Sequence, residues 1–147
     1  MQPISETAAS DTRREKILKT WEAAWNQGDT EALDDLLAPD YARYSTDGAR
    51  QDLASFKASV LTTRSAFPDL VTTVDDIVLD GDRAAIRWHS TGTHEGALLG
   101  VPATRRQVRV SGATFARFSG DHITEEYVTW DPRTLLTALG VLRVGQD

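Results

Sequence analysis

One carboxylate in the sequence is well placed to act as a general acid or base. Asp131 ends the run 122–131, in which Ile123, Tyr127 and Asp131 share one face if the strand is regular. If that face lines an apolar cavity, the carboxylate could take a proton from a carbon between two carbonyl groups, because a carboxylate shielded from water is a stronger base. A bulge would turn Asp131 to the other face. Its place directly before Pro132 also suits the N-cap of a terminal helix.

Histidine is the other residue type with suitable proton chemistry, and the sequence contains three histidines. Alternation along the run 83–94, counted from a core-facing Trp88, places His94 inside and His89 outside, although a kink at the glycine between them would change this parity. We therefore take His94 with Asp131 as the candidate catalytic residues. The alternative for His94 is a hydrogen-bonded structural histidine at a strand end.

Aromatic side chains supply the flat apolar walls that a planar polycyclic ligand needs. We expect five of them to contact a substrate: Trp25, Tyr44, Phe67, Trp88 and Tyr127. The alternative for the tryptophans and Phe67 is a place in the hydrophobic core, and the hydroxyl of Tyr44 could instead meet solvent. Arg87 and Arg109 alternate with apolar residues, so we expect them to point away from the core, into solvent or a subunit interface.

The spacing of apolar residues predicts helices in the first half of the chain. Apolar residues recur three and four apart between Asp11 and Gly28, and again over 53–67, which Pro68 ends. A shorter helix between these two begins at Asp29 or Thr30 and must end by Pro39. A short strand at 41–45 and a polar turn at 46–50 precede the last of the three helices.

From residue 70 onward the apolar period becomes two. Four runs rich in β-branched and aromatic residues are predicted strands: 70–79, 83–94, 107–118 and 122–131. Tight turns at 80–82 and 119–121 favour antiparallel pairing, and a short helix closes at Gly140. Three helices followed by such strands predict an α+β domain, in which a curved sheet wraps round the helices and leaves a cavity.

Length and composition exclude several classes of protein. The 147 residues suit a single domain over 11–143, preceded by a flexible polar arm at 1–10. With no cysteine there is neither a disulfide nor a Cys-ligated metal site. A net charge of -6 argues against a nucleic-acid partner. No apolar run is long enough to cross a membrane and the start lacks the features of a signal peptide, so we expect a cytoplasmic protein.

Three segments make the sequence similar to a known family: AAWNQGDTEALDDLLAPD (23–40), RWHSTGTHEGALLGVPATRRQVRV (87–110) and HITEEYVTWDPRTLLTALG (122–140). They contain T-H-x-G at 93–96, G-x-P-x-T at 100–104 and W-D at 130–131. The chain resembles the SnoaL-like polyketide cyclases, or ester cyclases, of the nuclear-transport-factor-2-like superfamily over roughly residues 14–142. The resemblance implies a cone-shaped α+β barrel.

The resemblance also implies an activity. Such an enzyme closes a carbon ring by intramolecular aldol condensation on a small apolar or polycyclic substrate, with neither a metal nor an organic cofactor. Asp131 matches the family's catalytic aspartate. Some members carry a further histidine on the penultimate strand, whereas VRVSGATFARF at 108–118 has none. The superfamily also implies a homodimer, or a higher homo-oligomer, formed through the exposed face of the sheet.

Three other functions stay open. An epoxide hydrolase on this fold would need an Asp-Arg-Asp group, of which only Asp131 and Arg87 are recognisable in the sequence. A cofactorless hydroxylase is a second possibility, since relatives of the cyclases hydroxylate rings. A non-catalytic binding module for an apolar ligand is the third, because a fold does not determine an activity.

Overall fold

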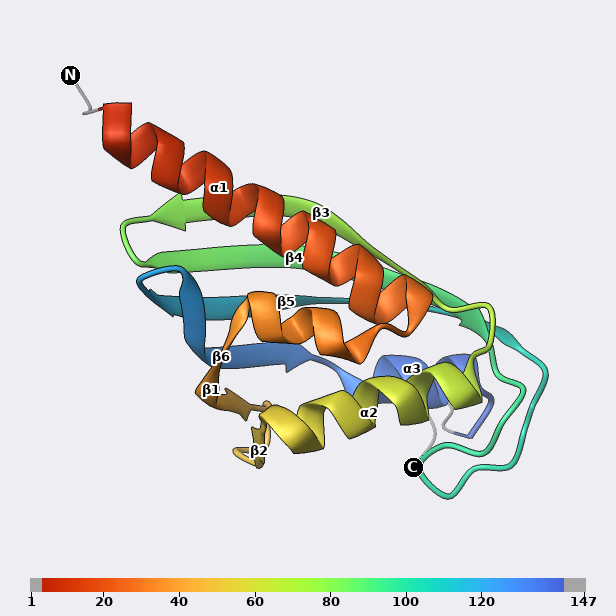
Figure 1. Cartoon of the computed structure of the whole chain (residues 1–147). Coiled ribbons are helices and arrows are strands. Elements are labelled where there is room, and N and C mark those ends of the chain that lie inside the picture. Colours follow the sequence, from red (N-terminus) through yellow and green to blue (C-terminus); the bar gives the residue numbers. More distant parts are fainter. Residues whose placement is uncertain (1–3, 142–147) are drawn as a thin grey trace.

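The computed structural model describes the backbone of residues 4–141 (Figure 1). Its helices are α1 (Ile4–Trp21) with a π-helical continuation η1 (Glu22–Asn26), the 3-10 helix η2 (Thr30–Asp35), α2 (Leu53–Ala66) and α3 (Pro132–Ala138). Its strands are β1 (Leu37–Tyr44), β2 (Arg50–Asp52), β3 (Val71–Asp80), β4 (Arg83–Thr93), β5 (Gln107–Ser119) and β6 (His122–Trp130). The four long strands and the helices α2 and α3 were all expected from the sequence.

The six strands form one mixed sheet in the order β2-β1-β6-β5-β4-β3. Neighbouring strands are antiparallel except β1 and β6, which are parallel. The sheet curves behind α1, η2 and α2, and β2 and β3 are its free edges, so it is not a closed barrel (Figure 1). The predicted α+β class, with a curved sheet wrapped round the helices, is confirmed.

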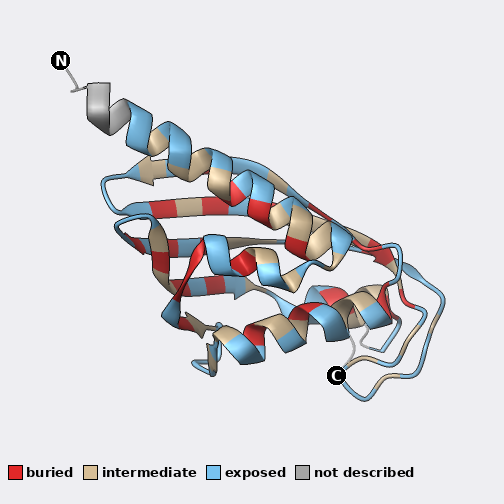
Figure 2. Ribbon diagram, in the orientation of Figure 1, coloured by how far each residue is buried: buried red, intermediate tan, exposed pale blue. Residues whose placement is uncertain are grey.

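The core lies between the helices and the covered face of the sheet (Figure 2). Ile17 of α1 and Val60 of α2 are fully buried against strand residues such as Ile86 and Ile123. A second cluster joins the end of α2 to α3 and contains Ala66, Phe67, Leu70, Val108, Leu135 and Leu139. Each large apolar side chain buried in this way contributes about 1.5–3 kcal/mol, which holds the helices on the sheet.

The chain differs from the predicted elements at three places. Helix α1 begins at Ile4 rather than Asp11, so residues 4–10 of the predicted arm are helical, while residues 1–3 and 142–143 lie outside the described residues. The predicted second helix stops at Asp35, and Pro39 lies within β1, where the pairing with β6 is irregular and a missing N–H is tolerated. The strand β2 falls partly in the predicted turn.

None of the described helices is long and apolar enough to span a membrane.

Candidate functional site

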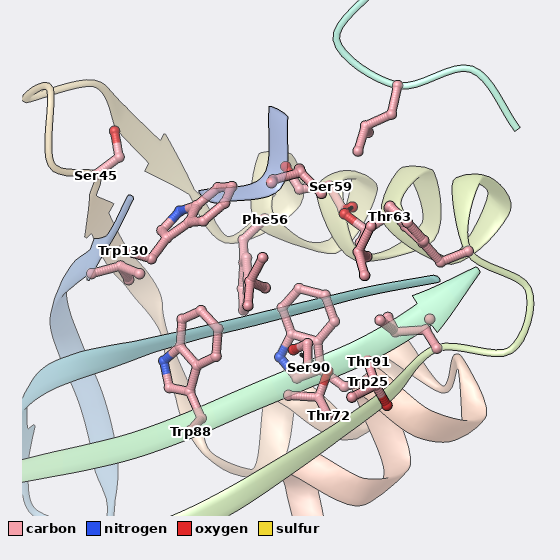
Figure 3. Close-up of a pocket in the computed structure, with 18 of the residues that line it drawn as sticks. Trp25, Ser45, Phe56, Ser59, Thr63, Thr72, Trp88, Ser90, Thr91 and Trp130 are labelled. Carbon is pink, nitrogen blue, oxygen red and sulfur yellow. Dashed lines mark hydrogen bonds between the residues drawn. The ribbon is translucent and has the colours of Figure 1, made fainter. Parts of the chain in front are cut away.

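A cavity of about 320 Å³ lies between α1, α2 and the sheet. All four tryptophans of the chain line it, together with Phe56 and Phe67. Figure 3 shows the indoles of Trp25, Trp88 and Trp130 around one space, with Ser59 and Thr63 on the neighbouring helix α2. The predicted substrate contacts Trp25, Phe67 and Trp88 therefore line the same cavity, and their contact with a substrate stays a prediction.

A glycine on β5 makes room for two of these indoles. Gly112 pairs with Trp88 on one side and with Trp130 on the other. A Cβ at this position would lie 2.6 Å from Cζ2 of Trp88 and 2.9 Å from Cβ of Trp130, so no larger residue fits without a shift. The Trp88 indole donates to Oγ1 of Thr114 at 3.1 Å, and Thr114 is buried, which fixes the ring. The strands thus hold a rigid aromatic surface beneath the cavity.

The π-helical turn η1 positions Trp25 at the opposite wall. Its carbonyl accepts a hydrogen bond from Nη1 of Arg64 at 2.6 Å, which ties the turn to α2. The next residue, Asn26, exchanges two hydrogen bonds with the backbone of Thr72, at 2.7 and 3.1 Å, which ties it to β3. The Trp25 ring meets Phe56 edge to face, with centroids 6.0 Å apart. The C-terminal end of the turn is therefore fixed to both α2 and β3, and the indole is held over the cavity.

The polar groups of the cavity are mostly hydroxyls and one amide: Ser45, Gln51, Ser59, Thr63, Thr72, Ser90 and Thr91. Gln51 donates to Oγ of Ser59 at 2.6 Å across the gap between β2 and α2. Among the described lining residues there is neither an aspartate, a glutamate nor a histidine, and the one charged side chain is that of Arg43. The cavity is therefore suited to a mainly apolar ligand with a few polar substituents.

Arg43 belongs to a buried polar group that the sequence analysis missed. Glu126 of β6 is 3% exposed, and it accepts hydrogen bonds from the Tyr41 hydroxyl and, at 3.3 Å, from Nη1 of Arg43. Burial, reinforced by the nearby Glu126 charge, raises the pKa of Tyr41 far above its ordinary range, so the phenol stays a neutral donor. The Arg43 guanidinium also lies over the Phe56 ring, 4.2 Å from its centroid.

A bulge in β6 explains why Glu126, and not Asp131, faces inward. Arg117 pairs with Glu125 and Phe118 with Ile123, so Thr124 is an extra residue on β6. After the bulge, Glu126 and Val128 are buried, whereas Tyr127 is 50% exposed. The expectation that Ile123 and Tyr127 share a face is wrong. Glu126 alternates with Val128 and Trp130, which indicates that the three side chains share one face of β6. The sequence does not show that this face is the covered one, because that depends on the bulge.

Asp131 caps the helix that follows it. Its Oδ1 accepts the backbone N–H of Arg133 at 2.9 Å at the start of α3, and 54% of its side chain is exposed. This is the N-cap arrangement that the sequence left open as the alternative. Asp131 does not line the cavity, although its neighbour Trp130 does.

The two tyrosines expected to contact a substrate lie elsewhere. Tyr44 and Tyr127 are neighbours across the parallel β1/β6 pair, and their rings stack with centroids 5.0 Å apart. Neither lines the cavity. Their assignment as cavity residues is wrong, because the Thr124 bulge turns Tyr127 to the uncovered face of the sheet, where Tyr44 packs on it.

The burial of the two strand histidines follows the expected alternation, although neither of them lines the cavity. His94 is completely buried, and His89 pairs with Asp75 of β3 at 2.8 Å. The hydrogen bond from His89 lowers the pKa of Asp75. His94 does not line the cavity; its ring packs on Phe67, with centroids 5.4 Å apart.

His94 and Thr104 join two of the sequence motifs. The Thr104 backbone N–H donates to Nδ1 of His94 at 3.2 Å, and its hydroxyl lies 3.1 Å from the same atom. Nδ1 is therefore the acceptor of a neutral ring, and Nε2 carries the proton, buried and with no partner among the described residues. The backbone N–H groups of Glu95 and Gly96 donate to the carbonyl of Ala66. These contacts anchor the loop 94–106, whose Leu98 and Leu99 reach the cavity.

The comparisons with known proteins agree with this arrangement. Residues 15–139 match the family described as SnoaL-like polyketide cyclase, and the chain belongs to that family. AclR of Streptomyces galilaeus, a candidate hydroxylase, is 31% identical, with 89% of this chain and 97% of AclR covered and a TM-score of 0.79. IdmH of Streptomyces antibioticus, a candidate polyketide cyclase, is 32% identical, with 90% and 99% covered and a TM-score of 0.74.

A SnoaL-like protein from Jannaschia sp. CCS1 shares the fold at 19% identity, with 90% and 94% of the two chains covered and a TM-score of 0.81. Together with the family match, these similarities identify the fold as that of the nuclear-transport-factor-2-like superfamily. No curated protein matches the chain.

Proposed function

We propose that the chain is a cyclase-like enzyme that binds a small, planar, apolar substrate in the four-tryptophan cavity and closes a carbon ring by intramolecular aldol condensation. The observation that carries the proposal is this aromatic cavity in a member of the polyketide cyclase family. In the reaction, a base takes a proton from a carbon between two carbonyl groups, and the enolate carbon bonds to the carbon of a third carbonyl group in the same molecule. The new alkoxide then takes up the proton, so the mass is unchanged until water leaves.

Asp131 is our proposed general acid and base, with His94 as the second candidate. The support for Asp131 is its match to the family's aspartate and its position next to Trp130, a wall of the cavity. To act there, the carboxylate would have to leave the backbone of Arg133 and turn past Trp130. Proton transfer by Asp131 is therefore a step to be tested directly.

A second candidate is a non-catalytic binding module. It is favoured by the described lining residues themselves, which include no carboxylate and no imidazole. A hydroxylase is a third candidate, supported by the similarity to AclR. The epoxide hydrolase has less support, because Arg87 is exposed, lies opposite Asp76 in the register of β3 and β4, and does not line the cavity.

Binding and turnover can be measured separately. Aromatic β-ketoesters that carry a further ketone group, in addition to the ketone and ester flanking the acidic carbon, are incubated with the protein, and tryptophan fluorescence reports occupation of the cavity. Ring closure gives a product of equal mass, or of that mass less one water, whereas hydroxylation adds one oxygen atom. Saturable binding with no product would favour the binding module, and no binding at all would exclude all three candidates for these compounds.

A matched pair of variants localises the binding. Thr63 lines the cavity from α2, and Thr62 is its exposed neighbour. Thr63→Trp should fill the cavity and abolish binding and turnover, whereas Thr62→Trp should leave both intact. Equal effects of the two substitutions would mean that the ligand binds elsewhere.

We also propose that two copies of the chain associate through the outer face of the sheet. Val78, Phe115 and Tyr127 are at least half exposed there, around a shallow hollow of about 190 Å³. The same hollow is bordered by Asp80 and Arg83, so a twofold contact could pair opposite charges between copies. Sedimentation should give a dimer that Phe115→Ser dissociates. A monomer at all concentrations would contradict the proposal.

A further inference from the structure

One end of the aromatic cavity carries donors that the fold leaves free. Arg43 lines the main cavity, and its only side-chain hydrogen bond among the described residues is the one from Nη1 to Glu126. A guanidinium has five N–H donors in a fixed plane, so most of its donors are available to a ligand. The contact with the Phe56 ring and the ion pair with Glu126 hold this plane in place.

A second donor belongs to a residue at the same end. The indole Nε1 of Trp21 is buried and has no hydrogen-bond partner among the described residues. Trp21 lines the main cavity, and it also borders, with Arg43 and Glu126, a small hollow of about 20 Å³. A hollow of this size is large enough for roughly one water-sized group. A buried donor without an acceptor is costly, so a ligand oxygen or a water at this position would stabilise it.

From these two observations we infer that Arg43 and Trp21 form an oxygen-binding end of the cavity, and that the ligand has a flat apolar body ending in an anionic oxygen group. The inference rests on the proposed function, because it names the substrate class of the same cavity. A carboxylate, or a carbonyl oxygen that becomes an enolate, has this chemistry. Arg43 is therefore proposed as a substrate-binding residue, with Glu126 and Tyr41 as the residues that position it.

The test compares two ligands of the same shape and different charge. 2-Naphthoate is an anion at neutral pH, and 2-naphthamide is its uncharged counterpart. Calorimetric titration of the full-length protein should give 2-naphthoate an affinity at least about tenfold higher, as expected for a charge-assisted hydrogen bond in a partly dry site. Equal affinities would overturn the inference while leaving the cavity a binding site. Binding of neither ligand would overturn it together with the proposed function.

Variants of the polar group separate binding from folding. Arg43→Gln should remove the preference for 2-naphthoate and keep the affinity for 2-naphthamide. Because this change leaves Glu126 buried without its ion pair, the double variant Arg43→Gln/Glu126→Gln provides a neutral version with the same expected loss. Glu126→Gln alone frees the Arg43 charge, and it should raise the 2-naphthoate affinity severalfold. A preference that survives both Arg43 variants, or a Glu126→Gln protein with weaker 2-naphthoate binding, would contradict the inference.

Trp21→Phe tests the second donor. Both ligands carry an acceptor oxygen, so loss of the indole N–H should weaken both of them severalfold. Unchanged affinities would exclude Trp21 from the oxygen-binding end.

Discussion

Trp130 lines the aromatic cavity, whereas the side chain of its neighbour Asp131 turns away to cap α3. The two side chains therefore have different surroundings, although they are adjacent in the W-D motif. A role of Asp131 in catalysis and a role in helix capping predict different outcomes for the same set of substitutions.

Asparagine is as good an N-cap as aspartate, whereas alanine cannot cap. Asp131→Asn should therefore keep the free energy of unfolding in urea, and Asp131→Ala should lower it by about 0.5–2 kcal/mol. If Asp131 is the general base, Asp131→Asn abolishes ring closure in a protein that is still folded. Normal turnover by Asp131→Asn would show that the residue acts only as a cap.

Gly112 should be intolerant of even one added carbon. A Cβ there would be 2.6 Å from both the Thr129 carbonyl and the Trp88 ring, so Gly112→Ala forces β5 or the indoles to move. Overpacking of this kind costs about 1–3 kcal/mol. We expect a lower midpoint in urea unfolding and weaker binding of 2-naphthamide. Ser111→Ala, at the exposed neighbour on β5, should change neither quantity. A stable Gly112→Ala protein with full affinity would mean that the two indoles are not fixed as described.

The long elements were predictable because their apolar periods extend over many residues. The strands β4 and β5 and helix α2 each follow one period from end to end, and the burial of His94 agrees with the alternation along β4. Trp25, Phe67 and Trp88 were identified for the same reason. The family motifs could also be recognised in the sequence. The contact between His94 and Thr104, which joins two of these motifs, could not be predicted from it.

The polar part of the site could not be predicted, because it depends on one bulge. Thr124 has no property that marks it as an extra residue, yet it reverses the facing of every later residue of β6. For this reason the burial of Glu126 was not predicted, and Tyr127 was wrongly assigned to the face that lines the cavity. Arg43 was missed because its partner Glu126 lies 83 residues away and joins it only through the parallel pairing of β1 with β6.

The buried Tyr41 should make the protein sensitive to alkaline pH. The pKa of Tyr41 is raised in the folded state, and that of an unfolded tyrosine is about 10. The resulting stability is complete below pH of about 10 and is lost above it, because only the unfolded chain can then ionise this phenol. The free energy of unfolding should fall on going to higher pH, and less steeply in Tyr41→Phe. Tyr44→Phe is the control and should follow the wild type. Parallel pH curves for all three proteins would contradict the burial of Tyr41.

Leu99 should contribute to binding and not to folding. It lines the cavity while 66% of it is exposed, and its φ of 52° lies in a region that a leucine rarely adopts. Asparagine tolerates this backbone conformation, so Leu99→Asn should leave the free energy of unfolding within about 0.5 kcal/mol. The same change removes apolar surface that a ligand would cover, and 2-naphthamide should bind severalfold more weakly. Leu61→Asn, at a half-exposed position of α2 that does not line the cavity, is the matched control. Equal affinities for the two variants would show that Leu99 does not contact the ligand.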